Sequence, residues 1–246
     1  MSASSLADLH QHVLWGLDDG PQTPQQMHEL LAQDAAQGVT LVYATAHAEF
    51  DGRPLDIPLY RERLAEGNAY CAQQHLPVTL LSGSEIRYTP AVPDALTRGA
   101  LLPLGNSRHV LVEFPPAVPL KTIQQAADCL YRAGYIPVLA HAERYRCLRY
   151  FPARAIRLRE EYGLLYQMNC SAFLHPRSAS VRRFAQRMLD ARAVDAIGSD
   201  AHSAARRPVR LRQTVDALLP RIGEEQTAAL TALARQLARR EGGDPA

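Results

Sequence analysis

The chain has 246 residues, of which 47% are hydrophobic, and a formal net charge of +2. This length suits one α/β barrel, and no apolar run reaches the ~18 to 20 residues needed to span a bilayer. The small net charge argues against a nucleic-acid-binding surface, and the first residues lack the charged and apolar regions of a secretion signal. One domain over residues 1–246, without membrane insertion and in the cytoplasm, is therefore expected.

Apolar runs rich in β-branched residues alternate with helical segments along the chain. The first helix has a clear start, because Thr23 can act as N-cap, Pro24 takes the first helical position and Gln26 can complete a capping box. Strands are predicted over residues 6–10, 39–45, 78–82, 109–112, 136–140, 164–168 and 195–198. Helices are predicted over about 24–37, 58–75, 120–133, 153–162, 180–192, 211–219 and 224–240, followed by a disordered tail from about 242 to 246.

This alternation favours a parallel sheet with right-handed crossovers that closes into a seven-stranded barrel. An open doubly wound sheet is the competing fold, but it would be expected to carry a glycine-rich phosphate loop after the first strand, and the sequence has none there. In a barrel, the carboxyl ends of all the strands lie on one face, where the active sites of such folds are built.

Side chains that can bind a metal stand at the predicted strand ends. His10 and His12 are two positions apart and project the same way from a strand. The others follow in order along the chain: Asp19 in the first loop, His47, Glu85, Glu113, His141, Asp200 and His202. Imidazole with carboxylate is a ligand set suited to first-row divalent metals. The sequence therefore predicts a metal centre on the carboxyl face of the barrel.

The charge of these ligands bears on the number of ions. The carboxylates of Asp19, Glu85, Glu113 and Asp200 contribute −4, so two divalent ions would leave the site about neutral and three would leave it roughly +2, which suits a phosphate dianion. Such ions lower the pKa of bound water toward ~7 and neutralise phosphoryl oxygens. Arg144 and Arg207 follow two of the ligands closely and are candidate phosphate clamps.

Taken together, these motifs resemble the PHP (polymerase and histidinol phosphatase) superfamily. Within it, the sequence is similar to the manganese-dependent protein-tyrosine phosphatases of bacterial capsular and exopolysaccharide gene clusters. The likeness runs from about Leu6 to Pro208 and rests on the following segments: Asp8-Leu9-His10-Gln11-His12, Asp18-Asp19-Gly20-Pro21, Gly83-Ser84-Glu85-Ile86, Val112-Glu113-Phe114, Ala140-His141-Ala142-Glu143-Arg144, Ser199-Asp200-Ala201-His202 and Arg207-Pro208.

The resemblance implies a distorted (β/α)7 TIM-like barrel with three divalent ions, Mn²⁺ first and Fe, Zn or Mg as alternatives. One ion would take His10, His12, Glu85 and Asp200, a second Glu85, Glu113 and His141, and a third Asp19, His47 and His202. Asp19 rather than Asp18 would be the ligand, and Arg144 and Arg207 would bind the phosphate. The implied substrate is phosphotyrosine on the C-terminal tail of a cognate tyrosine autokinase; the oligomeric state stays open.

Three alternative functions make different demands on the sequence. A cysteine-dependent tyrosine phosphatase needs Cys-x5-Arg, but the positions where arginine would stand hold Pro77, Tyr135, Ala153 and Pro176. A small-molecule phosphatase of the histidinol-phosphate type would use the same centre, and a non-catalytic PHP module would be free to lose ligands. The aromatic residues Trp15, Phe50 and Tyr88 are expected in loops on the same face, where both lining the site and ordinary packing remain open.

Overall fold

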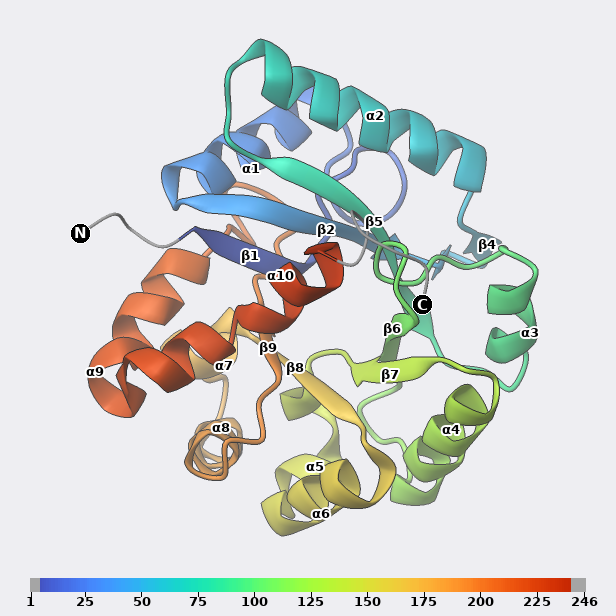
Figure 1. Cartoon of the computed structure of the whole chain (residues 1–246), viewed down its shortest axis with the longest axis vertical. Helices are drawn as coiled ribbons and strands as arrows, with labels where there is room; N and C mark the ends of the chain where they lie inside the picture. The colour runs from blue at the N-terminus through green and yellow to red at the C-terminus, as the bar shows by residue number, and fades with distance from the viewer. Residues whose placement is uncertain (1–4, 240–246) are drawn as a thin grey trace.

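The structure is a computed structural model that describes residues 5–239, so the expected tail from about 242 to 246 lies outside the described residues. Seven parallel strands form a sheet whose hydrogen-bonded order follows the chain (Figure 1). The strands are β1 (Leu6–Gln11), β2 (Val39–His47), β5 (Thr79–Arg87), β6 (His109–Glu113), β7 (Ile136–Leu139), β8 (Leu165–Asn169) and β9 (Ala196–Gly198).

The sheet curls until its first and last strands meet. Just beyond β9, the backbone N–H of Asp200 donates to the carbonyl of His10 at 2.8 Å, and that of His12 donates to the carbonyl of Ala201 at 2.9 Å. Close approach here requires a glycine, because a Cβ on Gly198 would lie 2.8 Å from the Cβ of His10. The expected (β/α)7 TIM-like barrel is confirmed as a nearly closed barrel.

Helices surround the barrel on its outer side (Figure 1). In α4, for example, the apolar residues Ile123, Ala126, Ala127 and Leu130 recur at helical spacing and are buried. The helices are α1 (Pro24–Ala36), α2 (Ile57–Gln73), α3 (Val92–Thr97), α4 (Leu120–Arg132), the 3-10 helix η1 (Ala142–Arg144), α5 (Arg146–Arg149), α6 (Pro152–Tyr162), α7 (Cys170–Leu174), α8 (Ala179–Asp190), α9 (Leu211–Ala229) and α10 (Ala232–Arg239).

The last helix closes one end of the barrel. Ala234 and Leu237 of α10 pack into a buried cluster with Leu9 and Tyr43, which point into the barrel from β1 and β2. The hydroxyl of Tyr43 donates to the carbonyl of Ala234 at 3.1 Å. Because this end is filled by α10, the opposite end, where the strands finish, is the end available for a site. Within residues 5–239, no helix combines the length and the apolar character needed to cross a membrane.

Some local predictions were wrong. The capping box at α1 is only half formed: the Thr23 side chain accepts from the backbone of Gln26, but the Gln26 side chain accepts from Gln22 at 2.7 Å instead of from Thr23. β5 is longer than predicted and carries Glu85 inside the strand, because its ladder with β2 continues to His47. The antiparallel hairpin β3 (Glu49–Phe50) and β4 (Arg53–Pro54), with the short helices α3, α5 and α7, was not predicted.

The predicted break between residues 219 and 224 is present, but a second break near Leu230 was not predicted. The chain leaves the helical path at Gly223, which has φ 79° and ψ 170°, a left-handed conformation that favours glycine. Helical turns then resume and run to Ala229, and the final break comes at Leu230. There the carbonyl of Leu230 accepts a hydrogen bond from Ile197 of β9 at 2.9 Å. This contact between distant segments, which local sequence does not reveal, orients α10 over the barrel.

Candidate metal centre

All nine predicted metal ligands lie together at the carboxyl ends of the strands. Glu85 is at the centre: its Oε2 lies 3.4 Å from Nε2 of His10 and 3.3 Å from Nε2 of His12. Its Oε1 lies 2.7 Å from Nε2 of His141. Glu113 reaches the same imidazole from the neighbouring strand, with Oε2 at 3.6 Å. His10 and His141, which are 131 positions apart in the sequence, thus converge on the carboxylate of Glu85.

A second part of the cluster surrounds Asp19. Its Oδ1 lies 3.2 Å from Nε2 of His202 and 3.5 Å from Nε2 of His47. Asp200 joins the two parts, because its Oδ1 lies 3.7 Å from Nε2 of both His10 and His12. The structure therefore brings each predicted ligand into contact with at least one other predicted ligand.

Three groups of these side chains place their donor atoms within 4.8 Å of one another, close enough to hold an ion. They are His10, His12 and Glu85; Glu85, Glu113 and His141; and His12, Asp19, His47 and His202. The grouping matches the expected sets except that Asp200 is not in the first group and His12 also belongs to the third. Nε2 of His12 has one lone pair, so it can bind one ion at a time.

The outer nitrogens of several imidazoles are held by other groups, which turns Nε2 toward the cluster. Nδ1 of His10 lies 3.1 Å from Oε1 of Gln167, and Nδ1 of His12 lies 2.6 Å from Oδ2 of Asp18. Nδ1 of His202 lies 3.0 Å from the carbonyl of Asp200. Such partners fix the tautomer and orientation of metal-binding histidines. The arrangement is that of a prepared metal site.

The backbone at two of the ligands adopts an uncommon conformation. His141 has φ 36° and Asp200 has φ 52°, both in the left-handed region that non-glycine residues rarely adopt. His141 lies two residues after the end of β7 and Asp200 two residues after the end of β9, and both side chains contact the cluster. Strain of this kind concentrates at functional sites, where surrounding contacts maintain it.

The protonation equilibria of the cluster show that it attracts positive charge. Burial by itself would raise the pKa of Glu85, but His10 and His141 reverse that effect and hold it well below the usual value. Burial by itself would lower the pKa of His141, but Glu85 and Glu113 raise it to about 9. In the absence of cations, protons on the imidazoles therefore compensate the carboxylates. The donor set and its charge fit divalent metal ions.

Arg144 and Arg207 lie at the rim and converge on Asp200. Nη2 of Arg144 donates to its Oδ2 at 2.5 Å, and Nη2 of Arg207 forms an ion pair with the same oxygen at 2.7 Å. The side-chain amide of Asn169 also donates to this oxygen, at 2.6 Å. Asp200 thus directs Oδ1 toward His10 and His12 while Oδ2 is held from the other side. Both arginine side chains are more than a third exposed, at 37% and 38%, so an incoming anion can reach them.

Sequence reasoning missed the residues behind the ligands. Asp18 was set aside in favour of Asp19, and the structure shows it buried against His12. Gln167 and Asn169 are polar residues in the otherwise apolar β8, two positions apart and therefore on one face. That pattern was the available signal. Trp15 packs against α2, where its indole N–H donates to Glu66 and Arg63 lies over its ring. The Tyr88 ring lies 5.5 Å from that of Phe114.

Comparison with known proteins identifies relatives of this chain. CapC of Staphylococcus aureus is 31% identical over 212 residues, which cover 85% of this chain and 81% of CapC. Tyrosine-protein phosphatase YwqE of Bacillus subtilis is 28% identical over 236 residues, covering 96% and 92%.

A solved structure from work on YwqE of Bacillus subtilis and CpsB of Streptococcus pneumoniae, described as metal-dependent tyrosine phosphatases, superposes with a TM-score of 0.88. Its sequence identity is 28%, and the match covers 95% of this chain and 94% of that one. The family model for capsular polysaccharide synthesis, CpsB/CapC, matches residues 6–236. The chain belongs to the CpsB/CapC family of capsular polysaccharide synthesis.

Proposed function

We propose that this protein is a metal-dependent protein-tyrosine phosphatase that hydrolyses phosphotyrosine on a protein. The observation that carries the proposal is the overlap of three candidate metal groups around Glu85 and His12, with Arg144 and Arg207 at their rim. The membership in the CpsB/CapC family and the fold shared with YwqE and CpsB support the same activity. The family model spans nearly the whole chain, in keeping with one phosphatase domain over residues 1–246.

We assign the nine clustered side chains as ligands of three divalent ions, with Mn²⁺ preferred and Fe, Zn or Mg as alternatives. Asp200 belongs with His10, His12 and Glu85, because its Oδ1 faces both imidazoles. Glu113 and His141 share Glu85, and Asp19, His47 and His202 form the third set. When bound, the ions supply an activated water for attack on phosphorus and neutralise charge on the phosphoryl oxygens. Three ions against four carboxylates would leave a net charge of about +2, which favours a phosphate dianion.

The protein's own side chains have distinct tasks in this proposal. Arg144 and Arg207 bind the phosphate oxygens and orient the ester for in-line attack, since a guanidinium fits two oxygens at once. Asp200, which also accepts a hydrogen bond from Asn169, keeps the Arg144 side chain at the rim when no substrate is present. Asp18 and Gln167 hold the ligand imidazoles in place without contacting substrate.

The exposure of the rim favours a protein substrate over a small one. The side chain of Asp19 is 45% exposed and those of Arg144 and Arg207 are more than a third exposed. A phosphotyrosine on a flexible segment can reach such a site without a lid. The C-terminal tail of a tyrosine autokinase that regulates polysaccharide synthesis fits this requirement, and its phosphorylation by ATP would place the reaction in the cytoplasm.

A comparison of substrates tests the proposal. Metal-loaded protein is assayed on a phosphotyrosine peptide, histidinol phosphate and a nucleotide phosphodiester, each with and without a chelator, and Glu85→Gln serves as the inactive control. We expect turnover of the phosphotyrosine peptide that the chelator abolishes and Mn²⁺ restores. A preference for histidinol phosphate would instead identify a small-molecule phosphatase. Absence of turnover on all three by metal-loaded protein would identify a non-catalytic module.

A further inference from the structure

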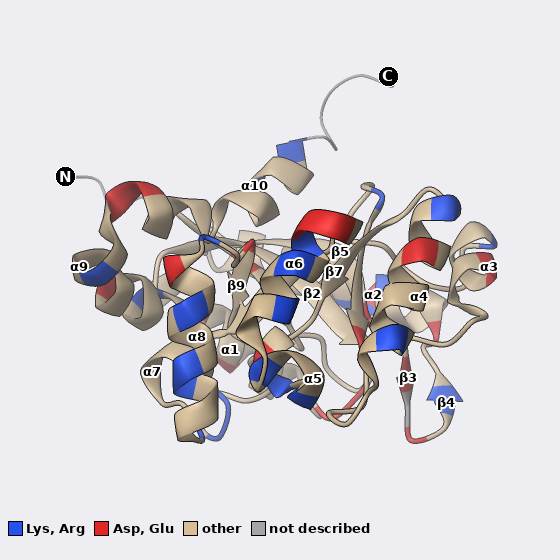
Figure 2. Ribbon diagram, turned by 90° about the horizontal axis from the view of Figure 1, so that it is seen from below, with Lys and Arg blue, Asp and Glu red and all other residues tan. Residues whose placement is uncertain are grey.

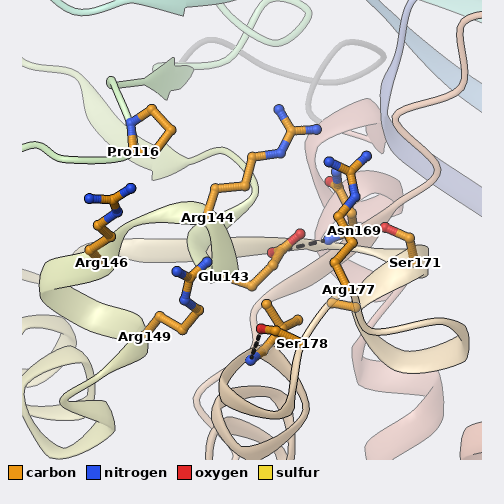
Figure 3. A pocket seen from close by; sticks show the side chains of 11 residues that line it. Pro116, Glu143, Arg144, Arg146, Arg149, Asn169, Ser171, Arg177 and Ser178 are labelled. Carbon is orange, nitrogen blue, oxygen red and sulfur yellow. Dashed lines mark hydrogen bonds between the residues drawn. The ribbon is translucent and has the colours of Figure 1, made fainter.

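A pocket lined by arginines lies next to the candidate metal centre. It has a volume of about 390 Å³ and is bounded by η1 and α5 on one side and by α7 and the start of α8 on the other. Figure 3 shows Arg146 and Arg149 across the pocket from Arg177, with Arg144 and Glu143 between them. Figure 2 shows basic residues gathered on α5, α6 and α8 on this side of the molecule.

Three of these arginines have no carboxylate partner among residues 5–239. Arg144 pairs with Asp200, but Arg146, Arg149 and Arg177 take part in no ion pair within the described chain. Nε of Arg149 is buried and has no hydrogen-bond acceptor there. Arg146 and Arg177 are exposed and Arg149 is half-buried, with its Nη2 donating to the Tyr150 hydroxyl at 3.4 Å. The buried Nε–H of Arg149 is costly unless a ligand supplies the missing acceptor.

The charge of the lining favours an anion. Glu143 is the acidic residue in it; its side chain is 5% exposed and turns toward the backbone N–H of Asn169. Against this single carboxylate stand the three unpaired arginines, which leaves a net charge of +2. The N-terminus of α8, capped by Ser178, also opens on the pocket and adds a positive dipole end.

This pocket adjoins the predicted phosphate site. A smaller cavity of about 150 Å³ is lined by Asp200, Arg207, Arg144 and Arg177, and the last two also line the arginine pocket. Arg144 therefore stands between the two cavities, facing the predicted phosphate on one side and the arginine pocket on the other. A single peptide can place one anionic group in each cavity.

We propose that the pocket formed by Arg146, Arg149 and Arg177 binds a second anionic group of the same peptide, a phosphotyrosine or an acidic residue near the one being hydrolysed. This inference rests on the proposed phosphatase function and specifies its substrate. The second anion would contribute to binding rather than to the chemical step, because its arginines do not face the metal ligands. A planar guanidinium recognises phosphate and carboxylate through the same paired hydrogen bonds, so either group can occupy the pocket.

Steady-state kinetics on three peptides test the proposal. The first peptide carries a single phosphotyrosine with neutral neighbours, the second adds another phosphotyrosine, and the third adds a glutamate instead. In the second and third peptides, the added residue is moved one position at a time on the N-terminal and C-terminal sides of the first phosphotyrosine. We expect the wild-type protein to show a lower KM for at least one doubly anionic peptide, with kcat nearly the same. In the double variant Arg146→Gln/Arg149→Gln, the ratio of the KM of the singly anionic peptide to that of the doubly anionic peptide should fall by roughly fivefold per arginine. This factor is the upper range for partly exposed ion pairs.

Arg108→Gln is the matched control. Arg108 is an exposed arginine that directly precedes β6, so it lies at the amino end of the strands, away from the site. Its replacement removes the same charge and should leave the preference intact. Arg146 is also exposed, so Arg146→Glu should fold, and it should favour a peptide in which lysine replaces the added anion. Circular dichroism and metal content verify the fold of each variant.

The outcomes separate the two proposals. Hydrolysis of all peptides with equal KM would overturn the second site and leave the phosphatase function standing. An unchanged preference for the doubly anionic peptide in both Arg146→Gln/Arg149→Gln and Arg146→Glu would do the same. Failure of metal-loaded wild-type protein to hydrolyse any phosphotyrosine peptide would overturn the function and this inference with it. A preference for the phosphorylated over the glutamate peptide would identify phosphate as the natural occupant, and the reverse would identify a carboxylate.

Discussion

Asp18 offers a sensitive test of how the metal centre is organised, because the substitution Asp18→Asn preserves its size and removes only charge and acceptor capacity. In the structure, Oδ2 of Asp18 lies 2.6 Å from Nδ1 of His12 and accepts from the backbone N–H of His47 at 2.9 Å. Oδ1 accepts from the backbone N–H of Gly20 at 2.9 Å. Both carboxylate oxygens therefore act as acceptors, and asparagine has only one acceptor to offer.

Either orientation of the asparagine amide creates a conflict. If its oxygen faces His12, its NH₂ group meets the N–H of Gly20; if it is flipped, the NH₂ group meets His12 and the N–H of His47. In the second case His12 must accept at Nδ1 and carry its proton on Nε2, which cannot then bind a metal. Loss of such a supporting partner costs about 10- to 100-fold in metal affinity. We expect kcat/KM at limiting metal to fall by a similar factor.

Metal affinity measured by isothermal titration calorimetry, together with phosphotyrosine hydrolysis, checks this prediction. Asp128→Asn, at an exposed position on α4, is the control for loss of one carboxylate. Because Asp18 acts through His12, the two substitutions should not be additive: in a His12→Ala background, Asp18→Asn should cost little more. Wild-type metal affinity in Asp18→Asn, or full additivity with His12→Ala, would refute the role assigned to Asp18.

Three other predictions concern the ligands, the rim and pH. His10→Ala should lose at least one ion and all turnover, since His10 contacts both Glu85 and Asp200; full metal occupancy with retained activity would contradict its assignment. Arg144→Ala should lower kcat/KM by about 100-fold without loss of metal, because Asp200 keeps Arg207 and Asn169; metal loss measured by mass spectrometry would show a structural role instead. The pKa of His141 is raised from 6.5 to about 9 in the folded protein. Its contribution to the stability of metal-free protein is therefore complete below pH 6.5 and is lost as the pH rises toward 9. The Tm of metal-free protein should therefore fall over that window while that of metal-loaded protein, whose imidazoles are neutral, stays nearly level; a rise in the metal-free Tm would contradict the sign.

The clustering of the candidate ligands was predictable because it follows from local rules. His10 and His12 share a face because strand side chains alternate, and β1 was recognised from its apolar pattern. His47, Glu113 and His141 stand at or just after strand ends, which parallel pairing brings to one edge. The end of β5 was misjudged, yet Glu85 still reached the centre, because the register with β2 aligns it with His47.

The supporting residues were less predictable, since their roles depend on contacts between segments far apart in the chain. Gln167 serves His10 from 157 positions away, and nothing in the sequence near either residue indicates the pairing. Asp18 and Asp19 are adjacent and chemically identical, so only the path of the loop decides that one is buried behind His12 and the other faces His47 and His202.

What the sequence by itself determined, then, is the barrel and which side chains cluster at its carboxyl end, because strand periodicity and the alternation of strands with helices are local properties of the chain. The tertiary structure alone decided which nitrogen of each histidine faces the centre, how α10 fills the far end of the barrel, and that Arg146, Arg149 and Arg177 surround one pocket. These features depend on side-chain packing and hydrogen bonds across the closed barrel, and short-range pattern carries no information about them.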